Sequence, residues 1–289
     1  MIHKPVLLKE VLEYLNPKTN QNFIDCTVGE GGYVEGILEK NGPDGKVLGI
    51  EADPEIYQKL RKQLSERFIP VNDSYINLKT IVEKLDFKPI SGILFDLGMS
   101  SWHLEASKRG FSFSKNEMLD MRYNPKSNPL TAEKIVNQWP EYEIRKILEE
   151  YGEEKFAKKI AKELIDERKV KPIRTTFQLV KIIKRAVSSR KTKIHFATRT
   201  FQALRIAVND ELSNFEKALP QAIEVLAPEG TIVIISFHSL EDRIVKSFFK
   251  DLSSKELKIL TKKPVTASQK EIKVNLRSRS AKLRAAAKI

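Results

Sequence analysis

Phe23-Ile24-Asp25-Cys26-Thr27-Val28-Gly29-Glu30-Gly31-Gly32 is the stretch of this sequence that most limits its fold. An apolar segment ends in an acid and is followed by three glycines within four positions. A second apolar run, 47–50, leads into another acid, Glu51. A strand, a glycine-rich turn, a helix and an acid after the next strand are typical of a nucleotide-type pocket, because glycine lets the backbone approach a ligand closely. A carboxylate at the position of Glu51 can accept hydrogen bonds from both hydroxyls of a ribose.

The details of the turn favour S-adenosylmethionine over a dinucleotide. The glycines follow the pattern G-x-G-G and not the G-x-G-x-x-G that holds a pyrophosphate. Asp25 and Glu30 place negative charge around the turn, which suits a ligand that carries an ammonium and a sulfonium. Two alternatives stay open from these residues alone. One is an NAD-type oxidoreductase on a similar sheet, and the other is a strand-turn-helix corner that binds nothing.

Composition and charge point to a cytoplasmic protein that meets a polyanion. The 289 residues include one cysteine and four histidines, which excludes an internal disulfide and leaves no zinc-type cluster. Neither a membrane-spanning run nor a signal peptide is expected. The net charge is +13, and it is concentrated: 168–199 holds eleven Lys or Arg and no acid, and 262–289 holds nine against one Glu. Such segregation favours nucleic acid as the partner over solvated basic faces.

Hydrophobic periodicity predicts alternating strands and helices, hence a parallel, doubly wound α/β sheet. The distance from the fourth strand to the fifth is too long for one crossover, so we expect an inserted all-helical domain at 105–195, between 1–104 and 196–289. The last residues, from about 270, are basic and are predicted to stay mobile until a partner orders them. The predicted strands are 22–26, 46–51, 68–71, 92–96 and 230–236, and the predicted helices include 5–15, 31–40, 54–66, 76–85 and a long pattern at 198–226.

Ligands in such sheets bind beyond the carboxyl ends of the strands, which gives candidate site residues. Tyr75 is expected against an adenine, and Asp96 where the methionine end of the cofactor meets the substrate. Phe237 and His238 are candidates for the substrate side of the pocket.

The segment that holds Phe237 and His238 has two other interpretations. A serine, a histidine and acids there invite comparison with a hydrolase, but the chain has no G-x-S-x-G elbow. The simplest structural interpretation is a helix capped by Ser239 with Asp242 three residues on.

The single cysteine limits the chemistry. Methylation of C5 of a pyrimidine needs a thiolate that first adds to the ring. Cys26 lies within the first predicted strand, where a buried packing role is expected. The sequence therefore favours transfer to nitrogen or oxygen, for which positioning and a proton acceptor suffice.

Several long and unusual segments resemble the bacterial family of small-subunit ribosomal RNA cytosine-N4 methyltransferases, called RsmH or MraW. The resemblance extends over essentially the whole chain. Its segments are 3–8, 25–32, 92–98, 109–113, 119–122, 151–154, 197–203 and 235–243.

This resemblance implies a class I, Rossmann-like, S-adenosylmethionine-dependent methyltransferase sheet whose inserted helical domain recognises the substrate. It implies methyl transfer to N4 of a cytidine in the decoding region, with small-subunit ribosomal RNA within the small ribosomal subunit as partner. It leaves monomer and dimer open, and also a non-catalytic ribosome-assembly factor that uses the cofactor as a structural ligand.

The resemblance also assigns site residues. It places Gly31, Gly32 and Tyr33 in the cofactor turn, Glu51 on the ribose and Tyr75 near the adenine. Asp96 and His103 complete the pocket. The family often has His, Asp and Gln where this chain has Tyr33, Glu51 and His103.

Overall fold

The computed structural model describes residues 5–62, 65–187 and 194–289. The chain divides into two compact units. A sheet unit comprises residues 1–98 and 212–289, and a helical unit comprises 99–211. The helical unit extends beyond the range 105–195 at both ends, because α5 (Ser101–Glu105) and α10 (Thr198–Asn209) belong to it.

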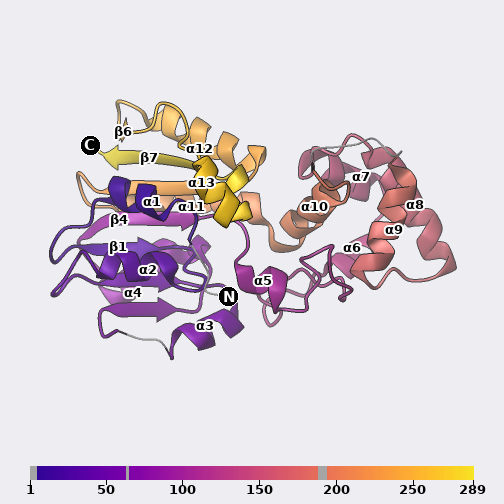
Figure 1. Ribbon diagram of the computed structural model, residues 1–289, viewed down its shortest axis with the longest axis horizontal. Coiled ribbons are helices and arrows are strands. Elements are labelled where there is room, and N and C mark those ends of the chain that lie inside the picture. The colour runs from indigo at the N-terminus through magenta and orange to yellow at the C-terminus, as the bar shows by residue number, and fades with distance from the viewer. Residues whose placement is uncertain (1–4, 63–64, 188–193) are drawn as a thin grey trace. The chain divides into compact units, whose positions relative to one another are not determined.

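The sheet unit is built on a seven-stranded sheet among the described residues, in the order β3-β2-β1-β4-β5-β7-β6 (Figure 1). The first five strands run parallel, and β7 is antiparallel to both of its neighbours. Because parallel strands are covered on both faces, their sequences are almost continuously apolar, and all four residues of β2 are buried. The strands are β1 (Asn22–Asp25), β2 (Val47–Ile50), β3 (Phe68–Val71), β4 (Ile90–Asp96), β5 (Thr231–Ser236), β6 (Leu257–Ile259) and β7 (Lys282–Lys288).

Helices cover both faces of this sheet, so the predicted doubly wound α/β class is confirmed. On one face, α4 (Leu78–Leu85), α11 (Glu211–Val225) and α12 (Ser239–Leu252) share one apolar core with the strands. On the other, α1 (Leu8–Leu15) packs against α2 (Gly32–Leu38), which lies beside it in Figure 1. Leu15 of α1 and Phe23 of β1 both pack against Gly92 of β4. A Cβ at Gly92 would collide with these two side chains. Pro54 is the first residue of α3 (Pro54–Leu60), whose N-cap is Asp53.

The prediction of a mobile C-terminal segment is wrong. Residues 269–288 form α13 (Gln269–Val274), a short 3₁₀ turn (Leu276–Ser280) and strand β7. Strand β7 lies between β5 and β6, and its residues Leu283, Ala285 and Ala286 are fully buried. Its charges also have local partners, since Arg284 and Lys282 contact the Asp242 carboxylate at 2.7 and 3.0 Å. The strand is not evident from the sequence, because alanines between basic residues give little hydrophobic alternation and have low β propensity.

The long helical pattern at 198–226 is two helices. Helix α10 ends at Asn209, and α11 begins at Glu211. Asp210 between them has φ 49°, a left-handed conformation that ends a helix and that Asp tolerates. Arg205 and Glu211 form a buried double hydrogen bond, 2.9 Å at each contact, across this break.

The helical unit has its own hydrophobic core. Leu119, Ile144, Ile160 and Leu204 are among its fully or almost fully buried residues. Thr131 caps α6 (Ala132–Gln138), and Thr175 caps α9 (Thr176–Ala186). Helices α7 (Glu141–Glu150) and α8 (Ala157–Val170) complete the unit. Part of the basic stretch 168–199, residues 188–193, lies outside the described residues. No helix among the described residues is long and apolar enough to cross a membrane.

Candidate functional site at the strand ends

The glycine-rich turn connects β1 to α2 at the carboxyl edge of the sheet. Gly31 has φ 87°, in the left-handed region where a side chain causes strain, and it is the N-cap of α2. A Cβ on Gly32 would lie 2.4 Å from Cγ of Pro5. Both glycines are therefore required by the turn itself.

Glu51 ties this turn to the next strand end. One carboxylate oxygen accepts a hydrogen bond from the backbone N–H of Gly29 (3.0 Å), and the other accepts from the N–H of Asp53 (2.7 Å). Glu51 is only 8% exposed. Burial raises the pKa of Glu51 to about 8, and the neighbouring Asp53 and Asp25 carboxylates add to the rise. The group is thus an acceptor held in a fixed position at the end of β2.

Asp25 and Asp96 end the adjacent strands β1 and β4, and Asp25 is fully buried whereas Asp96 is half-buried. The Thr27 hydroxyl lies between them: it accepts from the Asp96 N–H (2.6 Å), and Thr27 N–H donates to Asp25 (3.0 Å). Burial raises the pKa of Asp25 to about 7. Burial, and next the charge of Asp25, hold the pKa of Asp96 well above its usual range.

Each of these two carboxyl groups keeps one oxygen free of protein hydrogen bonds. Asp25 Oδ2 and Asp96 Oδ1 are buried and have no hydrogen-bond partner among the described residues. Buried carboxylate oxygens are normally satisfied, so two of them at neighbouring strand ends indicate a place for a positively charged or hydrogen-donating ligand.

Tyr33 lies beneath the turn. Its hydroxyl donates to the Val6 carbonyl oxygen (2.6 Å) and also interacts with the Asp96 carboxyl group. The ring is 3% exposed, and burial raises the pKa of its phenol well above the usual value. Tyr33 therefore connects the turn after β1 with the end of β4.

Two aromatic residues flank the carboxylates. Tyr75, half-buried after β3, meets the ring of Phe95 edge to face at 5.8 Å, one residue before Asp96. Phe237, after β5, lies over Gly98, since a Cβ built on that glycine would be 3.8 Å from the Phe237 ring. Tyr75 thus follows β3 and Phe237 follows β5. The three strands between them in the sheet, β2, β1 and β4, lead into the carboxyl groups of Glu51, Asp25 and Asp96.

His238 caps helix α12, so the interpretation with Ser239 as the cap is wrong. The His238 Nδ1 accepts from the Glu241 N–H (3.4 Å), and Glu241 returns the contact by accepting from the N–H groups of Phe237 (2.7 Å) and His238 (3.3 Å). The imidazole Nε2 is 3.1 Å from the other Glu241 oxygen. This reciprocal cap orients the His238 ring at the end of β5.

Cys26 follows Asp25 and is 2% exposed. Burial raises the pKa of its thiol well above the usual value, and the Asp25 charge raises it further. A neutral, covered thiol is a packing group and not a nucleophile, as its position in the sequence predicts.

His103 belongs to the helical unit. It lies in α5, is 4% exposed, and its ring meets Phe111 and Tyr123 edge to face, each at 5.0 Å. Its Nδ1 contacts the Ser100 hydroxyl at 3.0 Å. Within its own unit it is therefore an aromatic packing residue, and its part in a cofactor pocket stays a prediction.

Two residues with a clear place in this site have no assigned role in the sequence analysis, although the charge of Asp25 is noted there. Asp25 carries an oxygen without a hydrogen-bond partner among the described residues, and Glu241 accepts hydrogen bonds from the N–H groups of Phe237 and His238. Asp25 had a signal in the sequence, because an acid directly follows an apolar strand there. The signal for Glu241 is weaker. Glu241 is the third residue after His238, as in a capping box, but histidine is an uncommon helix cap.

The comparisons with known proteins agree with this layout. The model of the MraW methylase family matches residues 1–289. Ribosomal RNA small subunit methyltransferase H of Heliobacterium mobile is 44% identical over 309 residues, which covers 99% of each chain. The protein of the same name from Thermotoga neapolitana is 46% identical over 292 residues, covering 98% of this chain and 95% of its own. At this level of identity over the full length, the chain belongs to the MraW methylase family.

Proposed function

We propose that this protein transfers a methyl group from S-adenosylmethionine to the exocyclic N4 of a cytidine in the decoding region of small-subunit ribosomal RNA. Its relatives are named as small-subunit ribosomal RNA methyltransferases. The observation that carries the proposal is the group of buried and half-buried carboxylates at three strand ends, two of which have a buried oxygen without a hydrogen-bond partner among the described residues. A negative site of this kind suits a cofactor with a ribose, an ammonium and a sulfonium.

The residues present fit that cofactor. Glu51 is placed to accept the ribose hydroxyls, and Tyr75 offers a ring for the adenine. Asp25 and Asp96 offer free oxygens for positive charge, and Gly31 and Gly32 let the turn come close. The bound cofactor would supply an electrophilic methyl group on a sulfonium. Its approach would bring the carboxyls near a positive charge and favour their ionised forms.

The protein's own part in the transfer is to position the base and take up a proton. As N4 forms its bond to the methyl carbon and the carbon–sulfur bond breaks, N4 must lose one proton. Asp96 is the proposed acceptor, because a carboxylate whose pKa is raised by burial holds a proton more readily than an exposed one. Phe237 and His238 are proposed to hold the cytosine, with the ring orientation of His238 set by Glu241.

The helical unit is proposed to recognise the substrate, and the small ribosomal subunit in the cytoplasm is the proposed partner. The charge distribution supports an RNA substrate. Affinity that comes from lysine–phosphate contacts should fall steeply as salt rises. RNA binding that does not change between low and moderate salt would contradict this part of the proposal.

Labelled methyl transfer to small ribosomal subunits from a strain that lacks the gene tests the proposal. The product nucleoside is identified by mass spectrometry. We expect N4-methylated cytidine with the wild type and a large loss with Asp96→Asn, which keeps the shape of the side chain and removes the proton acceptor. Cofactor binding without transfer to intact subunits would instead support a non-catalytic assembly factor.

A further inference from the structure

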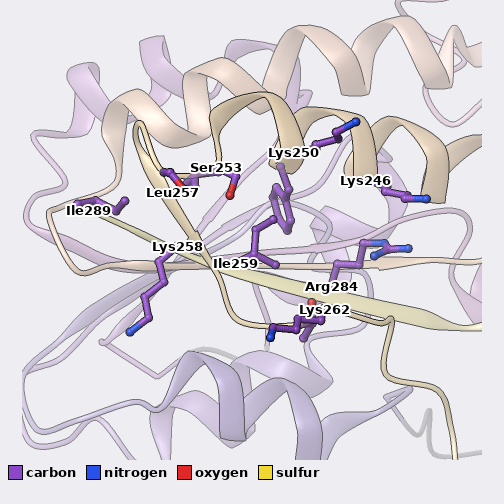
Figure 2. Close-up of a pocket in the computed structure, with 12 residues that line it drawn as sticks. Lys246, Lys250, Ser253, Leu257, Lys258, Ile259, Lys262, Arg284 and Ile289 are labelled. Atoms are coloured by element: carbon purple, nitrogen blue, oxygen red, sulfur yellow. The ribbon is translucent and has the colours of Figure 1, made fainter.

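A pocket of about 680 Å³ lies in the sheet unit between α12 and the edge strand β6 (Figure 2). Twelve residues line it, and five of them are basic, with no acid among the twelve. We call it the basic pocket. Its lining residues are Lys246, Phe249, Lys250, Ser253, Ser254, Leu257, Lys258, Ile259, Thr261, Lys262, Arg284 and Ile289.

The charges of the basic pocket come from three separate elements. Lys246 and Lys250 are one turn apart on α12, Lys258 lies on β6, and Lys262 follows that strand. All four lysines are exposed, and none has an ion pair within the described residues. Arg284, from β7, is different, because it is 8% exposed and is held by Asp242. The four lysine ammonium groups are therefore available for an anion.

The floor of the basic pocket is apolar. Phe249 and Leu257 are almost completely buried, and Ile259 is half-buried beside them. Lysines on an edge strand commonly prevent strand pairing between molecules, which accounts for Lys258. That role does not account for Lys246 and Lys250, which lie on a helix and face the same hollow. Five basic side chains and no acid around one hollow match a ligand that carries phosphate groups.

The basic pocket is also separate from the strand-end site. Helix α12 begins at the His238 cap and extends to Leu252. At about 1.5 Å per residue, Lys250 is roughly 18 Å along the axis from His238. The same helix therefore carries a residue proposed to hold the target base and, farther along, two cations of the pocket.

We propose that the basic pocket binds backbone phosphate in a single-stranded part of the RNA substrate that flanks the target cytidine. This inference rests on the proposed RNA substrate and adds a second point of attachment for it. Its effect is on RNA affinity, and the strand-end site performs the reaction independently of it. Phosphate contacts do not depend on the base, so the site supplies position more than sequence specificity.

The test compares two double variants with equal loss of charge. Lys246→Gln/Lys250→Gln removes two cations of the basic pocket, and Lys40→Gln/Lys84→Gln removes two exposed lysines elsewhere. Fluorescence anisotropy with a labelled single-stranded oligoribonucleotide of the decoding region gives Kd across a salt series. We expect the pocket variant to bind about tenfold more weakly and to lower the slope of log K against log salt by about 1.4, or ~0.7 per lost contact. The control pair should stay within twofold of the wild type.

A second pair places a negative charge in the basic pocket. Ser254 is exposed and has φ 65°, which both Asp and Asn tolerate. Ser254→Asp should weaken RNA binding, and Ser254→Asn should not. In methyl transfer to small subunits, the pocket variants should raise KM and leave kcat and cofactor affinity unchanged.

The possible failures are distinguishable. Equal losses in the pocket and control pairs would overturn the inference, because general charge would then explain them. Saturable binding of free cytidine monophosphate at the basic pocket without any effect on RNA affinity would also overturn it. Absence of methyl transfer by the wild type would contradict the proposed function, whereas the anisotropy series tests the basic pocket without catalysis.

Discussion

The fold places carboxyl groups at the strand ends where removal from water disfavours their ionised form. Asp25 and Glu51 are buried and Asp96 is half-buried, and burial is the first cause of the raised pKa of each. A protein without a use for such groups would gain stability by replacing them. Their retention is understandable if a cationic ligand offsets their desolvation, and two predictions at this scale test that explanation.

The first concerns Glu51. In the free protein its pKa is about 8, so it is largely protonated at pH 7. If the ribose hydroxyls require the carboxylate, cofactor affinity should rise with pH, by up to about tenfold per unit below pH 8, and level off above it. Calorimetry at several pH values measures this, and Glu51→Gln should bind weakly with a flatter profile. An unchanged affinity in Glu51→Gln would remove this residue from the cofactor site.

The second concerns stability. The pKa of Asp25 is about 7 in the folded protein and 3.8 ordinarily, so the folded chain binds this proton more tightly than the unfolded chain. That contribution to stability is full below about pH 4 and is lost as pH rises to 7. Asp25→Asn keeps the acceptor for Thr27 N–H and should therefore raise the free energy of unfolding at pH 8, by at most roughly 4 kcal/mol.

Urea unfolding of the cofactor-free protein at pH 5 and pH 8 checks the Asp25 prediction. The gain from Asp25→Asn should be clearly smaller at pH 5 than at pH 8. A variant that loses the same stability at both pH values would show that Asp25 contributes packing or hydrogen bonding and no ionisation penalty. The cofactor affinity of the same variant should fall.

At the scale of elements, strand β7 is the part of the sheet that most needs its exact sequence of small residues. It is flanked by β5 and β6, and Ala285 within it is fully buried. Ala285→Asp should cost at least about 3 kcal/mol or prevent folding, because it buries a charge without a partner. Ala287→Asp, at a half-buried position of the same strand, is the matched control and should cost much less. Thermal unfolding of both variants measures the difference.

The elements that the sequence predicts well are those with long, clear periodicity. The parallel strands β1 to β5 and the helices between them follow from apolar runs, and those of β1, β2 and β4 lead into an acid. Strands β6 and β7 do not, because Lys-Leu-Arg-Ala-Ala-Ala-Lys has little β propensity and is a strand through its place between two partners. The break at Asp210 was missed because one residue with φ 49° leaves the apolar period almost intact.

For the candidate site, the sequence predicts which residues lie at the strand ends but not the contacts that hold them. Residues at strand ends, such as Glu51, Asp96 and Phe237, follow from the topology rule for parallel sheets. The contacts that hold them do not: Glu51 with Gly29, and Tyr33 with Val6, join segments 22 and 27 residues apart. Only tertiary packing places those groups together, and a single sequence carries no direct signal of it.

At the scale of the whole molecule, two separate hydrophobic cores correspond to two units. The helical unit is one continuous segment, 99–211, and many of its apolar side chains are fully buried within its own core. Expressed alone, it should fold as a helical domain with one cooperative thermal transition, followed by circular dichroism. A non-cooperative or unfolded product would show that this core depends on the sheet unit.

The position of β7 has a consequence for synthesis on the ribosome. This strand comes later in the chain than every other strand of the sheet, yet it lies in the interior of the strand order. Until it leaves the exit tunnel, β5 is an unpaired edge and β6 has no partner within the sheet. A nascent chain therefore exposes the apolar edge of β5 from the synthesis of residue 236 until the end of translation. Chains that stop early should be recognised by chaperones and proteases, so only a fully translated sheet unit would reach its RNA.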